Sequence, residues 1–198
     1  MKNSKPDFDE IIKESRQLFR DIGESPDRAA VITAAAILDD LLDLLLRATM
    51  LDNDKVVIDL LEKQRLFSFA TRIDLCYSLG LISKSERMDL HVIRKIRNDF
   101  AHSWKSVDYN DESTVDRCGE FELAKRFWAI SGNEPADTQT QFVSEWVLLA
   151  NQLCLRIKNC RHADKVSEME DNTPIIFGGG TAPEAGNRSA GIIVDLLE

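Results

Sequence analysis

The chain lacks a long apolar run that is free of charge. Its most apolar stretch, residues 32–51, contains Asp39, Asp40, Asp43 and Arg47. Charged side chains are costly inside a bilayer, so this stretch is expected to form a buried helix of a globular domain. A membrane span is therefore not predicted.

The chain also lacks the residue spacings of a metal or disulfide protein. None of its four cysteines forms a C-x-x-C pair or has a histidine at zinc spacing. These cysteines are Cys76, Cys118, Cys154 and Cys160. We expect small buried thiols in a reducing compartment, with no metal and no cofactor. The first ten residues, MKNSKPDFDE, contain no apolar segment, so no signal peptide is predicted and a cytoplasmic protein is expected.

Basic residues are outnumbered. The chain has 25 Lys and Arg against 34 Asp and Glu, which gives a net charge of −9. An acidic protein repels nucleic-acid phosphates unless its basic residues are segregated. The local basic cluster consists of Arg94, Lys95, Arg97 and Lys105. This cluster is small for a duplex-binding surface, so we expect no direct sequence-specific binding to DNA.

The strongest helical pattern covers residues 83–104. Ser83 and Glu86 have the S-x-x-E spacing of a capping box, which satisfies two backbone donors at a helix start. Four apolar residues follow at spacings of three, four and four: Ile93, Ile96, Phe100 and Trp104. They form one narrow stripe on a helix. His102 lies about 180° from that stripe, with Asn98 one turn before it, so both are expected on the opposite side.

The end of this helix resembles a known sequence motif. Residues 97–102 read RNDFAH, which resembles the R-x4-H motif of the HEPN superfamily. The longer stretch over residues 67–104 resembles the mannitol operon repressor family more closely, with weaker similarity from about residue 29 to 155. That family is all-helical, and the resemblance implies negative control of a sugar-uptake operon.

The HEPN resemblance implies a candidate site. In a metal-independent ribonuclease of that superfamily, Arg97 would hold the phosphate, His102 would transfer a proton and Asn98 would orient them. Many such enzymes have a tyrosine two residues after the histidine, whereas this chain has Trp104. An interhelical salt bridge explains Arg97 equally well, because it lies at the edge of the apolar stripe. The aspartates available for that salt bridge are Asp39, Asp40 and Asp43.

The periodicity predicts an all-α fold. We expect a single helical-bundle domain of five to seven helices over residues 1–162. The expected helices cover residues 8–22, 26–51, 54–63, 68–79, 83–104, 113–123 and 138–162. Ser25 is expected to cap the second of these, and Gly80 is expected to close the fourth in a left-handed conformation. Residues 163–198 are acidic and glycine-rich, so we expect a disordered tail that ends in the apolar segment IIVDLLE.

Two functions stay open from the sequence. The first is a non-enzymatic bacterial transcriptional regulator that acts through a protein partner. Direct base readout is not expected, because the exposed side of residues 83–104 is predicted to mix Asp89 and Asp99 with basic residues. The alternative is a HEPN-type ribonuclease of a toxin or phage-defence system, with RNA as its substrate. Either function is compatible with a homodimer. A third hypothesis, ranked below these two, is a helical adaptor protein.

Overall fold

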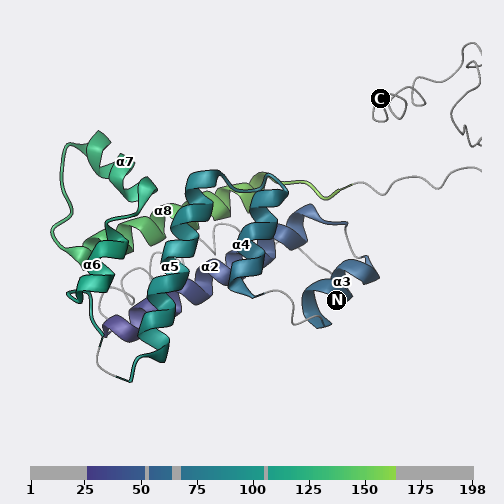
Figure 1. Cartoon of the computed structure of the whole chain (residues 1–198). Helices are drawn as coiled ribbons and strands as arrows, with labels where there is room; N and C mark the ends of the chain where they lie inside the picture. Colours follow the sequence, from purple (N-terminus) through teal and green to yellow (C-terminus); the bar gives the residue numbers. More distant parts are fainter. Residues whose placement is uncertain (1–25, 52–53, 64–67, 105–106, 164–198) are drawn as a thin grey trace, which may run out of the picture. The chain divides into compact units, whose positions relative to one another are not determined.

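The computed structural model describes residues 26–51, 54–63, 68–104 and 107–163. All of them belong to the first of two compact units, residues 1–164. The described residues form seven helices and no strand (Figure 1), so the predicted all-α fold is confirmed. The helices are α2 (Asp27–Thr49), α3 (Lys55–Lys63), α4 (Phe69–Ser78), α5 (Lys84–His102), α6 (Glu112–Cys118), α7 (Glu122–Ser131) and α8 (Thr138–Asn159).

Helix α2 is the central element of this unit. Nine of its side chains are buried, including Leu38, Leu42 and Leu45. Each fully buried leucine contributes about 1.5–3 kcal/mol to folding. Helix α2 packs against α8, α5 and α4, and α4 and α5 cross in front of it in Figure 1. Among the described residues, no helix is both long enough and apolar enough to cross a membrane.

Helices α4 and α5 form an antiparallel hairpin. Gly80 adopts φ +70°, and Leu81 N donates to Cys76 O at 2.8 Å, which closes α4 as predicted. The expected capping box starts α5: Ser83 N donates to Glu86 Oε2 at 2.6 Å, and Glu86 N donates to Ser83 Oγ at 3.3 Å. Local signals in the sequence therefore set both ends of this turn.

An aromatic cluster joins α5 to the helices that follow it. The ring centroids of Phe100 and Tyr109 are 5.9 Å apart, and those of Tyr109 and Phe142 are 5.7 Å apart. Phe121 extends the cluster toward α7, with its centroid 6.4 Å from that of Phe142. All four side chains are buried, so this end of the bundle is held by aromatic packing.

The region after residue 112 differs from the prediction. One short helix was expected over residues 113–123, but α6 ends at Cys118 and a second helix, α7, begins at Glu122. Phe121 is fully buried between them and acts as the N-cap residue of α7. The sequence pattern does not predict the break between α6 and α7, because side chains from distant helices bind the first backbone N–H groups of α7, as described below.

Smaller differences occur at helix ends. Trp104 was placed on the apolar stripe, but α5 ends at His102 and the Trp104 side chain is 91% exposed. Helix α8 ends at Asn159, three residues before the predicted end. The predicted helix over residues 8–22, the expected cap Ser25 and the predicted tail with its IIVDLLE segment lie outside the described residues.

The thiols largely follow the expectation from the sequence. Cys76 and Cys118 are buried, whereas Cys154 and Cys160 are partly buried. Burial raises the pKa of both buried thiols to about 12, so they stay protonated at neutral pH. Buried and protonated thiols behave as small apolar side chains.

Candidate functional site: the outer face of α5

Helix α5 presents a polar face to the outside of the bundle. Six residues fall within about 80° of one another on the helix, and we define them as the α5 face: Lys84, Arg87, His91, Lys95, Asn98 and His102. None of them is acidic. The opposite side of α5 is buried, including Ile93, Ile96 and Phe100, so the helix separates an apolar from a basic side.

Two of the three acidic residues of α5, Glu86 and Asp89, are buried, and the third, Asp99, lies at the flank of this face. Glu86 is 3% exposed and accepts from Arg156 Nη2 of α8 at 2.7 and 2.8 Å. Asp89 is fully buried, and Asp99 at the flank of the helix pairs with Arg117 of α6. The expectation that Asp89 lies on the exposed side was therefore wrong. Asp99, whose side chain is 38% exposed, does lie beside the basic residues, one turn after Lys95. Each of these carboxylates has a partner on another helix.

A hydrogen-bonded cluster fixes the first half of the α5 face. Asp74 Oδ1 of α4 accepts from Arg87 Nε at 2.7 Å and lies 3.1 Å from His91 Nε2. Two hydrogen bonds keep the pKa of Asp74 below its usual value, and the one with His91 has a larger effect than the one with Arg87. The Arg87 guanidinium also lies over the Tyr77 ring, 5.3 Å from its centroid. This cluster clamps α4 against α5.

The three residues of the predicted site lie at the other end of α5. Arg97 Nη1 donates to Asn98 Oδ1 at 2.9 Å, and both side chains are partly buried. His102 is exposed one turn after Asn98, in the last turn of the helix. Arg28 Nη2 of α2 donates to Ser103 O at 3.0 Å and so ties down the end of α5. Asn98 and His102 therefore share the α5 face, while Arg97 lies beside it.

The aspartates of α2 have a basic partner other than Arg97. Arg72 Nη1 of α4 is 2.7 Å from Asp39 Oδ1, and Arg72 Nε is 3.4 Å from Asp43 Oδ1. Arg47 also reaches Asp43, at 2.6 Å, and Asp40 is exposed. These contacts join α2 to α4. In the sequence, Arg72 stands next to the core residue Ile73, at the margin of the buried side of α4, and that position is the signal that could have identified it.

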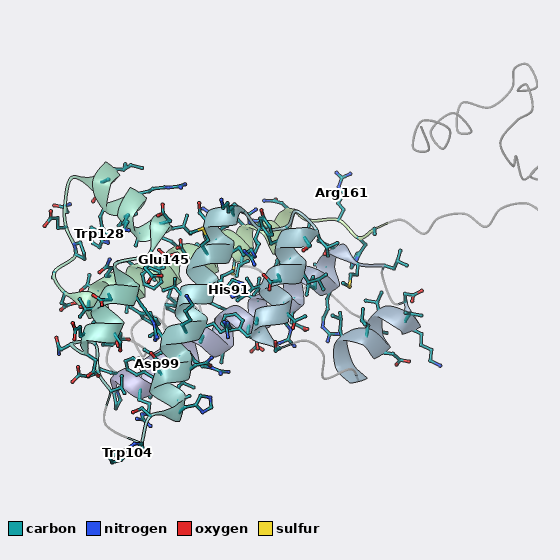
Figure 2. The ribbon with its side chains drawn as sticks, viewed as in Figure 1. His91, Asp99, Trp104, Trp128, Glu145 and Arg161 are labelled. Carbon is teal, nitrogen blue, oxygen red and sulfur yellow. The ribbon has the colours of Figure 1, made fainter. Side chains whose placement is uncertain are left out.

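A buried acid pair was not anticipated from the sequence. Asp89 of α5 accepts from the backbone N–H groups of Glu122 and Leu123 at 3.0 and 3.1 Å. Glu145 of α8 accepts from Ala124 N at 2.7 Å through Oε2. Two carboxylates from different helices thus cap the first turn of α7 (Figure 2, where Glu145 is labelled). The signal in the sequence was an acid at a core position, directly before the buried Trp146.

The acid pair holds a proton at neutral pH. Burial, and after it the charge of Asp89, raises the pKa of Glu145 from 4.5 to about 9. Burial also raises the pKa of Asp89, which the two backbone N–H groups partly offset. We assign the proton to Glu145 Oε1, because no protein donor among the described residues reaches that buried oxygen and Asp89 already accepts two hydrogen bonds. A hydrogen bond joins the two side chains, so Glu145 is neutral and the pair carries one negative charge, on Asp89.

Comparison with known proteins identifies the family. A family model described as "Mannitol repressor" (MtlR) matches residues 22–162. The chain belongs to the mannitol repressor family. The match includes all seven described helices, and with them the α5 face and the acid pair. A search of curated proteins finds no significant match.

A solved structure shares the mannitol repressor fold. One chain of the X-ray structure of the MtlR–HPr complex from Escherichia coli matches with a TM-score of 0.57 at 18% sequence identity. The match covers 70% of this chain and 97% of that chain. Neither this match nor the mannitol repressor family model is to a ribonuclease.

Proposed function

We propose that this protein is a non-enzymatic negative regulator of a sugar-uptake operon, such as a mannitol operon, in the bacterial cytoplasm. The family match over residues 22–162 is the observation that carries the proposal. The α5 face adds support, because it gathers polar and basic side chains on one side of a single helix, where a partner can bind. Repression by such a protein depends on binding.

The regulator acts through a protein partner in this proposal, and the partner is an HPr protein. The support is the similar fold of a chain in an MtlR–HPr complex. Direct base readout is disfavoured because α4 and α5 pack as an antiparallel hairpin through Asp74, Arg87 and His91. A DNA-binding helix-turn-helix instead crosses its two helices at about 90–120°. Dimer formation remains part of the proposal.

Calorimetric titration with purified HPr from the same organism tests the partner. We expect saturable binding by the full-length protein at physiological salt. Electrophoretic mobility shift with the operator and with scrambled DNA of equal length tests the mode of action, and we expect equally weak binding to both. Lack of HPr binding at concentrations of 100 micromolar and above would remove HPr as the partner, whereas tight operator-specific binding would contradict indirect action.

A further inference from the structure

The basic character of the α5 face contrasts with the acidic chain around it. The whole chain has a net charge of −9, yet the residues of this face are basic or neutral. Lys84 and Lys95 are exposed, and within the described residues neither forms an ion pair. Arg87 and His91 are paired with the half-exposed carboxylate of Asp74, which fixes their positions and offsets their charge. The positive charge of this face therefore comes mainly from Lys84 and Lys95. Segregated charge of one sign steers a partner of the opposite sign.

Exposed apolar side chains occur near both ends of α5. Met88 is 45% exposed in the first half of α5, and Tyr77, under the Arg87 guanidinium, is 41% exposed. Trp104 is 91% exposed just beyond the other end of the helix. Trp, Tyr, Met and Arg are the residue types enriched at protein interfaces.

We propose that the α5 face, with Met88 and Trp104 at its ends, is the docking surface for an acidic face of a protein partner. The inference rests on the proposed function, in which a protein partner mediates regulation. Charge complementarity selects an acidic occupant, and the flanking apolar side chains favour a folded protein or helix over a nucleic acid. Affinity for duplex DNA depends on how many phosphates the protein neutralises, and within the described part of the chain this face offers only two unpaired lysines for that purpose, Lys84 and Lys95.

Tryptophan fluorescence of the full-length protein gives a direct test, because Trp104 is far more exposed than Trp128 or Trp146. The probes are a 20-residue helical peptide of Glu and Leu and a 20-base-pair DNA duplex. We expect the peptide to shift Trp104 emission to shorter wavelength, and the shift to be absent in Trp104→Phe. Lys95→Glu should weaken peptide binding by at least about fivefold at low salt.

Lys125→Glu is the matched control. It makes the same charge change at an exposed lysine of α7, and we expect peptide affinity within about twofold of wild type. Circular dichroism establishes that each variant is folded. Equal peptide binding by wild type and Lys95→Glu would overturn the proposal, as would tighter binding of the duplex than of the peptide.

Titration with HPr separates this proposal from the proposed function. HPr binding that weakens in Lys95→Glu and persists in Lys125→Glu supports both. HPr binding that is unchanged in Lys95→Glu overturns the docking surface while leaving HPr as the partner. If HPr fails to bind the wild type, the partner assignment falls, and the peptide titration alone decides whether the α5 face accepts acidic proteins.

Discussion

At the scale of single residues, the proton on Glu145 links stability to pH. Glu145 has a pKa of about 9 in the folded protein and an ordinary value of 4.5. The folded state therefore binds more protons between these values, so the free energy of unfolding must fall as pH rises from about 4.5 toward 9. One proton sets an upper slope of about 1.4 kcal/mol per pH unit.

Glu145→Gln should remove most of that pH dependence. The amide oxygen accepts from Ala124 N and the amide nitrogen donates to Asp89, so the hydrogen bonds of the protonated acid are reproduced. We expect Asp89→Asn to destabilise the fold by about 1–3 kcal/mol, because its NH2 group would face a backbone N–H of α7. Urea unfolding at pH 5, 7 and 9 measures both. An unchanged pH slope in Glu145→Gln would contradict the assignment of the proton.

Arg72 should matter more for stability than Arg97. The Arg72 side chain is 19% exposed and pairs with Asp39 and Asp43. Arg72→Ala therefore removes the ion pair of Asp39 and leaves Asp43 with Arg47 alone. We expect a loss of about 1–3 kcal/mol in the free energy of unfolding. Arg97→Ala is the matched control, since its described hydrogen bond is to the adjacent Asn98. A larger loss in Arg97→Ala would reinstate Arg97 as the interhelical partner predicted from the sequence.

At the scale of elements, the helices that could be predicted are those whose ends carry local signals. Ser83, Glu86 and Gly80 are close in sequence to the backbone groups that they satisfy, so their roles were readable. Helix α7 has no such cap, because its first turn is satisfied by Asp89 and Glu145 from α5 and α8. A cap supplied by tertiary structure leaves no local pattern.

The contribution of the capping box in the α4–α5 turn to stability can be tested by substitution. Ser83→Ala removes the side chain that accepts from Glu86 N, so we expect a loss of about 1 kcal/mol in the free energy of unfolding. Ser113→Ala, an exposed serine in the first turn of α6, is the control and should change stability by less than about 0.5 kcal/mol. Thermal or urea unfolding measures both, and equal effects would argue that the capping box contributes little.

At the scale of the whole molecule, the chemistry suggested by R-x4-H was less predictable than the fold. Periodicity indicates a bundle, but it cannot distinguish a catalytic arginine from one that binds its neighbour. In the structure Arg97 donates to Asn98, while His102 is exposed at a helix end. The burial of Asp89 could not be predicted either, since it depends on the backbone N–H groups of α7 that bind its carboxylate.

The protein as a regulator should leave RNA intact. We expect no cleavage of total RNA in EDTA by the folded wild type, and the same result for Arg97→Ala and His102→Ala. The net negative charge of the chain also repels the phosphates of RNA and so slows its association. Gel electrophoresis of the RNA provides the measurement. Cleavage by the wild type that disappears in both variants would restore the ribonuclease interpretation.

The three carboxylates of α5 also connect it to neighbouring helices. Glu86 reaches α8, Asp89 reaches α7 and Asp99 reaches α6. Burial of Glu86 and Asp89 therefore keeps two negative charges off the α5 face and joins α5 to two neighbouring helices. A substitution such as Arg117→Ala in α6, outside the face, would leave Asp99 unpaired beside Lys95 and dilute the positive field.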